Sequence, residues 1–125
     1  MRRPAVYERA SRGDTSGQLA ELLEWAGRQP EPLAWFRDEG STLDERPGLR
    51  SLLRAVAAGQ VSYVVVWRLD RLYRSVPELV GMVRLLGRLR VGLVSLRDRF
   101  DSETESGRET FRRLAEIAAS EGARR

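Results

Sequence analysis

The apolar run VSYVVVW, at residues 61–67, is the feature that most constrains the fold of this chain. Its near-continuous β-branched character is typical of a strand buried on both faces, which occurs in parallel sheets covered by helices. Three shorter β-like stretches, at 4–11, 33–36 and 91–96, alternate with helical patterns. This order predicts an α/β domain with a mainly parallel sheet of four to five strands, flanked by helices.

The helical patterns lie between these strands and after the last one. We expect helices over 15–27, 49–59 and 77–89, and a last helix from about 106 with one apolar stripe of Phe111, Leu114, Ile117 and Ala118. Thr15 with Gln18, and Ser75 with Glu78, have the spacing of a capping box. The last helix runs to the final residues without a cap, so we expect it to be cut short. Residues 1–125 are expected to form one domain, with no DNA-binding domain present.

Composition removes several classes of function. The chain has no cysteine and no histidine, which excludes disulfides, the commonest general base and the commonest transition-metal ligand. No apolar run is long enough to span a membrane, so we expect a cytoplasmic protein without a membrane partner. The net charge of +4 is compatible with a polyanionic partner but does not identify one. All basic residues are arginine, yet the absence of asparagine fits a GC-rich coding bias, so only the positions of the arginines are informative.

Polar side chains follow three of the predicted strands. Arg9 and Ser11 follow the first strand, Asp38 follows the second, and the segment 68–74 follows the third. The sequence of this segment is RLDRLYR, and it contains Arg68, Asp70, Arg71 and Arg74. Because the carboxyl ends of parallel strands share one edge of a sheet, we expect these residues to converge.

The residues at this edge admit two interpretations. Ser11, between Arg9 and Arg12, could attack a phosphate whose charge the guanidiniums neutralise, which suits phosphoryl transfer in a chain without histidine. Alternatively, Ser11 is an ordinary turn serine, and Asp70 and Arg74 form an exposed ion pair worth about 0.3–0.5 kcal/mol. A metal site is not predicted, because no paired carboxylates occur at the strand ends. The residues by themselves leave the first two interpretations open.

Four motifs, in order, resemble the catalytic domain of the serine recombinases, the resolvases and DNA invertases. YERAS at 7–11 is similar to the start Y-x-R-x-S of that family, and DEG…DERPGL at 38–49 to its acidic loop followed by R-P-G-L. VSYVVVWRLDRLYRS resembles the strand that ends in L-D-R-L-x-R, and GLVSLRDRFDSETESGRETF the loop that opens a long helix.

The resemblance implies that Ser11 attacks a DNA phosphodiester, forms a 5′-phosphoserine link and releases a 3′-hydroxyl, without a metal or other cofactor. It implies that the scissile phosphate is surrounded by Arg9, Arg46, Arg71 and Arg74. Asp70 would orient these arginines, and Arg68 and Arg12 would face DNA. Supporting roles would fall to Asp38, Gln18 and Glu121. The implied partners are double-stranded DNA and further copies of the chain, as a homodimer or tetramer in the full-length form.

The chain also departs from that family. Gln18 follows Ser11 at a shorter interval than the family's glutamine, so its capping-box role with Thr15 stays open. Gly122 stands where the long helix has an arginine, and this helix forms the dimer interface in the family. As an isolated fragment the chain could therefore be a monomer. The alternative function is a catalytically silent, truncated remnant that acts as an interaction or DNA-association module.

Overall fold

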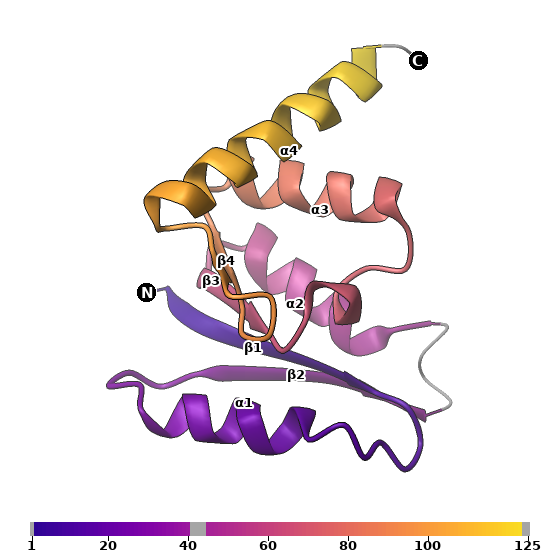
Figure 1. The fold of residues 1–125 in the computed structure, drawn as a ribbon, viewed down its shortest axis with the longest axis vertical. Helices are drawn as coiled ribbons and strands as arrows, with labels where there is room; N and C mark the ends of the chain where they lie inside the picture. Colours follow the sequence, from indigo (N-terminus) through magenta and orange to yellow (C-terminus); the bar gives the residue numbers. More distant parts are fainter. Residues whose placement is uncertain (1, 41–44, 124–125) are drawn as a thin grey trace.

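A computed structural model describes residues 2–40 and 45–123, with the side chains of 114, 115 and 117–123 left aside. A five-stranded sheet in the order β2-β1-β3-β4-β5 forms the centre of the molecule (Figure 1). Its strands are β1 (Arg3–Ala10), β2 (Ala34–Glu39), β3 (Val61–Val66), β4 (Gly92–Ser95) and β5 (Phe100–Asp101). The first four strands are parallel, and β5 runs antiparallel to β4. The predicted α/β fold with a mainly parallel sheet is confirmed.

Helices cover both faces of this sheet. On one face lies α1 (Gln18–Gly27), and on the other lie α2 (Pro47–Ala57) and α3 (Val76–Arg88) (Figure 1). A short 3-10 turn, Leu69–Arg71, joins β3 to the segment before α3. The last helix, α4 (Glu105–Ala123), packs on α3, and its carboxyl end extends away from the sheet (Figure 1).

The central strands are buried on both faces, as the apolar run 61–67 predicts. Val64 and Val66 of β3 point into the larger core beneath α2 and α3, together with Tyr7 and Leu52. Val65 of β3 points into a smaller core beneath α1. Four of the six β3 side chains are buried, and they lie on both faces of the sheet, which is why the sequence does not alternate between polar and apolar residues.

Of the two predicted capping boxes, the serine half of one is present, while the Glu78 carboxylate accepts from the N–H of Arg74 rather than from that of Ser75. Ser75 is the N-cap of α3, and its Oγ accepts a hydrogen bond of 3.3 Å from the backbone N–H of Glu78. The prediction for Thr15 and Gln18 is wrong, because α1 begins at Gln18 rather than at 15. Its N-cap is Gly17, whose φ of 85° lies in the left-handed region that favours glycine. The side chain of Gln18 turns away from the helix end and is buried.

Within the described residues, no helix is both long and apolar enough to cross a membrane. The predictions for Leu114, Ile117, Ala118 and Glu121 concern side chains outside the described part of the structure.

Gly48, at the start of α2, tests how tightly this helix is seated on β2. A Cβ added there would overlap the backbone carbonyl of Arg37 and lie 2.9 Å from Asp38 Oδ1. Gly48→Ala should therefore lower the free energy of unfolding by about 3 kcal/mol, measured by urea denaturation.

The matched control is Gly81→Ala, within α3. A Cβ at Gly81 would have no atom within 4 Å, so this variant should gain up to about 1 kcal/mol from helix propensity. Equal effects of the two substitutions would contradict the close seating of α2.

Candidate active site

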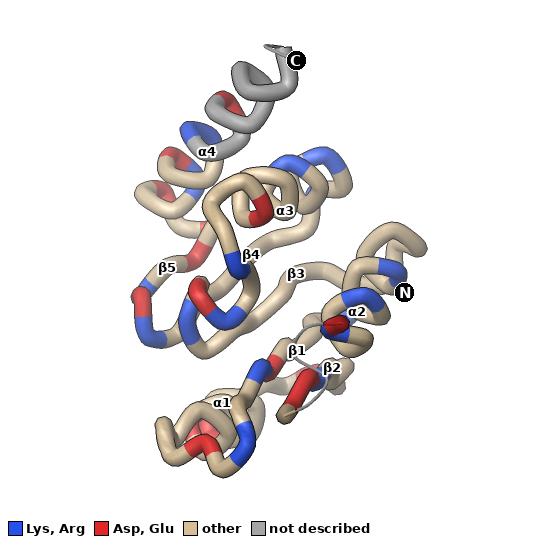
Figure 2. Tube along the Cα trace, turned by 90° about the vertical axis from the view of Figure 1, so that its right-hand side faces the viewer, with Lys and Arg blue, Asp and Glu red and all other residues tan. Residues whose placement is uncertain are grey.

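The carboxyl ends of the four parallel strands meet at one edge of the sheet, as their order predicts. The loops that follow these ends contain basic and acidic residues side by side (Figure 2). Ser11 follows β1, Asp38 is near the end of β2, and Arg68 and Arg71 follow β3. The structure therefore brings together residues far apart in the sequence, such as Arg9 of β1 and Arg71, which follows β3.

Ser11 is exposed at the first position beyond β1. Its backbone carbonyl accepts a hydrogen bond of 3.1 Å from the N–H of Asp14, which closes a turn over 11–14. Ser11 lines an open pocket of about 250 Å³ together with Glu8, Asp14 and Gln18. No side chain among the described residues hydrogen-bonds to its hydroxyl. The hydroxyl is thus presented to solvent rather than used to stabilise the turn.

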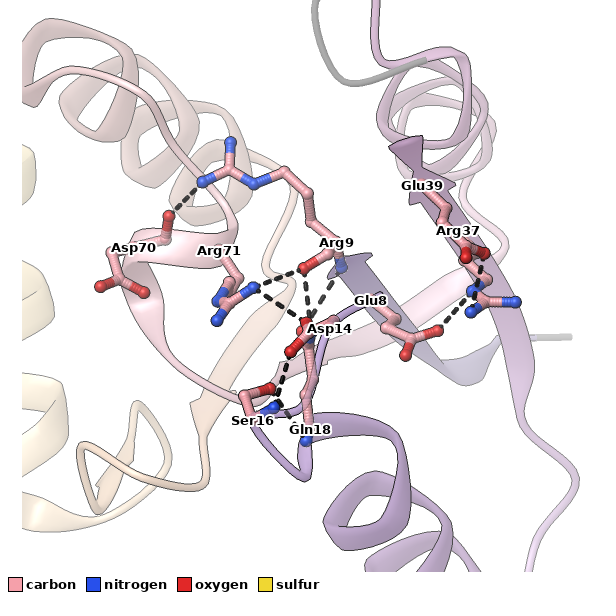
Figure 3. Close-up of polar contacts among 9 residues, drawn as sticks. All are labelled: Glu8, Arg9, Asp14, Ser16, Gln18, Arg37, Glu39, Asp70 and Arg71. Carbon is pink, nitrogen blue, oxygen red and sulfur yellow. Dashed lines mark hydrogen bonds and ion pairs between the residues drawn. The ribbon is translucent and has the colours of Figure 1, made fainter. Parts of the chain in front are cut away.

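Arg71 lies against the same turn. Its Nη1 donates to the carbonyl oxygen of Arg9 at 3.0 Å and to Asp14 Oδ2 at 3.4 Å (Figure 3). The guanidinium also lies 5.2 Å from the centroid of the Trp67 ring, within range of a cation–π interaction. Three contacts from three segments therefore hold this cation against Arg9, which lies two residues before Ser11 in the sequence.

The carboxylates of Asp70 and Asp14 pair with different arginines. The carboxylate of Asp70 pairs with Arg68 at 3.0 Å, and both side chains are about half exposed. The residue that pairs with Arg71 is Asp14. The 3-10 turn explains the difference, because it directs Asp70 to solvent and Arg71 back toward β1 (Figure 3).

Arg9 connects β1 to the segment after β3. Its Nη2 donates to the backbone carbonyls of Asp70, in a short contact, and of Tyr73, at 3.5 Å. Burial lowers the pKa of Arg9, and the nearby positive charges of Arg46 and Arg71 lower it further. The Arg9 guanidinium is therefore close enough to those of Arg46 and Arg71 to be repelled by each, and an anion near Arg9 would relieve that repulsion.

Gln18 supports this arrangement from α1. Its Nε2 donates to the carbonyl of Arg9 at 2.9 Å and to Asp14 Oδ2 at 3.3 Å, and its Oε1 accepts from the N–H of Arg9 at 3.4 Å (Figure 3). The amide thus pairs with the edge of β1 as a neighbouring strand would. The short interval between Ser11 and Gln18 is accommodated because α1 begins at Gln18 itself.

Asp38 is a buried carboxylate with three partners. Its Oδ1 accepts from the N–H of Gly48 at 2.7 Å, and its Oδ2 accepts from the N–H of Leu49 at 2.9 Å and from the hydroxyl of Tyr7 at 2.7 Å. Two of these donors are the otherwise unpaired N–H groups of the first turn of α2, where a negative charge is favoured. Asp38 therefore seats α2, and the residue before it, against the sheet.

That residue is Arg46, the N-cap of α2, with left-handed angles of φ 49° and ψ 59°. A side chain in this region is uncommon and costs roughly 1 kcal/mol or more. The guanidinium is almost buried and forms a bidentate pair with Glu78, Nη1 to Oε1 at 2.6 Å and Nη2 to Oε2 at 2.7 Å. These hydrogen bonds raise the pKa of Arg46 and lower that of Glu78.

The remaining predicted residues lie at the margin of the site. Arg12 is exposed within the turn after Ser11, and Arg68 lies 6.0 Å from the centroid of the Trp67 ring. Arg74 lines a cavity of about 400 Å³ with Arg46 and Glu78. Among the described residues, no group of three or more carboxylates is arranged to hold a metal ion.

Three polar contacts of this site were not predicted. No partner was predicted for Asp14, and Glu78 and Tyr7 were expected only as parts of a helix start and of a motif. Their spacing in the sequence gives no indication of the partners that they find across the sheet. A signal was available only for Tyr7, since a phenol in a core strand usually has a hydrogen-bond partner.

Residues 5–125 match the family described as "Resolvase, N terminal domain". The chain belongs to the resolvase family. Its resemblance to the serine recombinases is thus confirmed. Among curated relatives, it is 39% identical over 87 residues to a DNA-invertase of Enterobacteria phage P7, covering 69% of this chain and 46% of that protein. It is 36% identical over 87 residues to the serine recombinase gin of Escherichia phage Mu, covering 69% of this chain and 44% of that protein.

Solved structures of the family show the same fold. The N-terminal catalytic domain of TP901-1 integrase superposes with a TM-score of 0.77 at 25% identity, covering 98% of each chain. A resolvase family site-specific recombinase from Streptococcus pneumoniae superposes with a TM-score of 0.71 at 18% identity, covering 99% of this chain and 91% of that one. This chain spans less than half the length of the two curated resolvase relatives described above.

The buried hydroxyl of Tyr7 allows a test of the contact with Asp38. Tyr7→Phe should lower the free energy of unfolding by about 1–3 kcal/mol, because it removes one donor from a buried carboxylate. Tyr63→Phe is the control, since the Tyr63 hydroxyl has no hydrogen bond to the described residues. Thermal or urea denaturation of both variants measures the difference, and equal losses would refute the contact.

The Arg46–Glu78 pair should make stability depend on pH. The pKa of Glu78 is lowered in the folded protein from its ordinary value of 4.5, mainly by its hydrogen bonds to Arg46. The pair therefore contributes fully above pH 4.5 and less as the pH falls through the folded pKa. At pH 7, Glu78→Gln should cost on the order of 1–2 kcal/mol in urea denaturation. That difference should shrink toward pH 3, and a difference independent of pH would contradict the ionic pairing.

Proposed function

We propose that the chain is the catalytic domain of a site-specific recombinase, in which Ser11 cleaves and rejoins duplex DNA. The observation that supports this most directly is the exposed hydroxyl of Ser11, at the end of β1, in a turn whose Asp14 is paired with Arg71. Membership of the resolvase family and relatives described as a DNA-invertase and a serine recombinase support the same activity.

In the proposed reaction, Ser11 Oγ attacks the phosphorus of a DNA phosphodiester. A new Oγ–P bond forms, the P–O3′ bond breaks, and the phosphate stays on the 5′ end as a phosphoserine. The hydroxyl loses its proton to a neighbouring acceptor, and the departing O3′ takes up a proton to become a 3′-hydroxyl. Asp70, half exposed beside Arg68, is the candidate acceptor and donor of these protons. Attack by a 3′-hydroxyl of a new partner strand reverses the step.

The arginines supply the stabilisation that this reaction needs. Negative charge grows on the phosphate oxygens in the transition state, and fixed cations in a desolvated site stabilise it strongly. Arg9 and Arg71 lie next to the Ser11 turn, and Arg46 is held near Arg9 by α2. We assign these three, with Arg74, to the scissile phosphate. We assign the more exposed Arg12 and Arg68 to neighbouring DNA.

The proposed partners are double-stranded DNA and further copies of the chain, as a homodimer or tetramer in the full-length form, acting in the cytoplasm. The alternative of a silent remnant is not favoured. A remnant has no need to keep an almost buried arginine such as Arg46 paired with a carboxylate, because burying a cation costs free energy.

A covalent trap tests the nucleophile. The chain is joined to a DNA-binding domain of known site and incubated with duplexes in which two inverted copies of that site flank a randomised, nicked segment. We expect a protein–DNA adduct that survives detergent, with protein on the 5′ end and a 3′ end that a polymerase extends. Ser11→Ala should abolish the adduct.

Ser51→Ala is the control, because Ser51 is an exposed serine on α2. It should form the adduct at the rate of the unchanged chain. Adduct formation by Ser11→Ala, at any measurable rate, would contradict the assignment of Ser11 as the nucleophile.

Removal of divalent metal ions separates this mechanism from that of a metal-dependent nuclease. We expect adduct formation to continue at an unchanged rate in excess EDTA, because the charge on the phosphate is met by arginines. The trap above, run with and without chelator, measures this, and loss of cleavage that Mg²⁺ restores would contradict the proposal.

A further inference from the structure

We infer that Glu78 is a positioning residue that places Arg46 and the Arg74 segment for catalysis; this inference rests on the proposed function. Glu78 lies in the first turn of α3, 32 residues after Arg46 in the sequence. None of the motifs at the strand ends includes it. Its contacts go well beyond those of a residue that starts a helix.

The first observation is the geometry of the pair with Arg46. Both terminal nitrogens of Arg46 donate to Glu78, at 2.6 and 2.7 Å, so the carboxylate meets the guanidinium end-on. A guanidinium has five N–H donors, and this arrangement uses two of them. The Nε–H and one further hydrogen on each terminal nitrogen stay available to a phosphate. Glu78 can therefore hold Arg46 without replacing the substrate.

The second observation is that Glu78 also fixes the backbone before α3. Its Oε1, already bonded to Arg46, accepts a second hydrogen bond of 3.1 Å from the N–H of Arg74. The N–H of Glu78 itself is bonded to Ser75 Oγ at 3.3 Å. One carboxylate thus joins the N-cap of α2 to the segment between β3 and α3, and both segments bring an arginine that we assign to the phosphate.

The third observation is that, among the described residues, Glu78 is the residue to which the Arg46 guanidinium donates hydrogen bonds. The residue has left-handed backbone angles and a side chain that is only 10% exposed. A buried cation in a strained segment needs a fixed anionic partner to stay in one place. Arg46, Arg74 and Glu78 line the same cavity between α2 and α3, which shows that the three side chains converge.

Glutamine at 78 would not replace the carboxylate. Its oxygen could accept from Arg46 Nη1 and the N–H of Arg74, but its NH2 group would then face Arg46 Nη2, donor against donor. The guanidinium would have to turn away. We therefore expect Glu78→Gln to misplace Arg46 while leaving the start of α3 intact.

The test measures single-turnover adduct formation at saturating DNA, in the fusion and trap described above. Glu78→Gln should slow cleavage by on the order of tenfold to a hundredfold, because small displacements of catalytic groups have effects of this size. The dissociation constant for DNA should stay within about twofold, since one phosphate contact among several is altered. Should Glu78→Gln fold poorly, Glu78→Asp, which keeps the charge but shortens the side chain, takes its place with the same expectation.

Ser75→Ala is the matched control. It removes the hydrogen bond from the N–H of Glu78 to Ser75 Oγ and should cost about 1 kcal/mol of stability, as loss of an N-cap does. It leaves the Arg46–Glu78 pair in place, so its cleavage rate should equal that of the unchanged chain. A normal rate for Glu78→Gln, or an equal loss for Ser75→Ala, would overturn the inference.

A second measurement does not depend on DNA. An Nη–H resonance of Arg46 that is bonded to Glu78, in the chain alone and assigned by its loss in Arg46→Lys, should exchange slowly with solvent. It should stay so in Ser75→Ala and become fast in Glu78→Gln. If the trap shows no Ser11 adduct, the proposed function fails, and this resonance still decides about Glu78: slow exchange in Glu78→Gln would overturn its role.

Discussion

The buried carboxylate of Asp38 is the contact on which the rest of the site depends. It joins three elements, because it lies on β2, accepts from Tyr7 on β1, and accepts from the first N–H groups of α2. A carboxylate with 1% exposure is stable only when its oxygens are hydrogen-bonded, and here all its donors come from the protein. The consequence is that α2 begins at one place on the sheet, and that Arg46, directly before it, has a fixed position near β1.

The arginines at this edge come from separate segments, and each has its own partner. Arg71 is held by Asp14 and the carbonyl of Arg9, Arg46 by Glu78, and Arg9 by the carbonyls that follow β3. This follows from electrostatics, since clustered guanidiniums repel one another and cannot be desolvated without acceptors. In the protein by itself, carboxylates and carbonyl groups supply those acceptors. A phosphate that binds at this edge would meet cations that are already in place, so the arginine side chains would need to move little on binding.

The elements of secondary structure could be predicted from the sequence with good accuracy. The unbroken β-branched run of β3 indicated a parallel sheet, and Ser75 with Glu78 marked the start of α3 correctly. The expected start of α1 at Thr15 was wrong. Gly17 takes the N-cap position, and the side chain of Gln18 donates a hydrogen bond to the carbonyl of Arg9 on β1 instead. Asp70 was expected to orient the arginines around the phosphate. Its carboxylate pairs with Arg68 while the adjacent Arg71 pairs with Asp14, because residues adjacent in the sequence point in different directions when the chain turns. The short strand β5 lies in a segment that we expected to be a loop.

The sequence by itself determined which side chains stand at the ends of the strands, because burial patterns set the strands and parallel order sets a shared edge. It therefore identified Ser11, Arg9, Asp38 and the arginines after β3 as neighbours. Only the tertiary structure decided which acceptor each cation uses. Pairing depends on distances of a few ångströms between segments far apart in the chain, such as Arg46 and Glu78. The spacing of residues cannot give such distances, since they result from how the helices seat on the sheet.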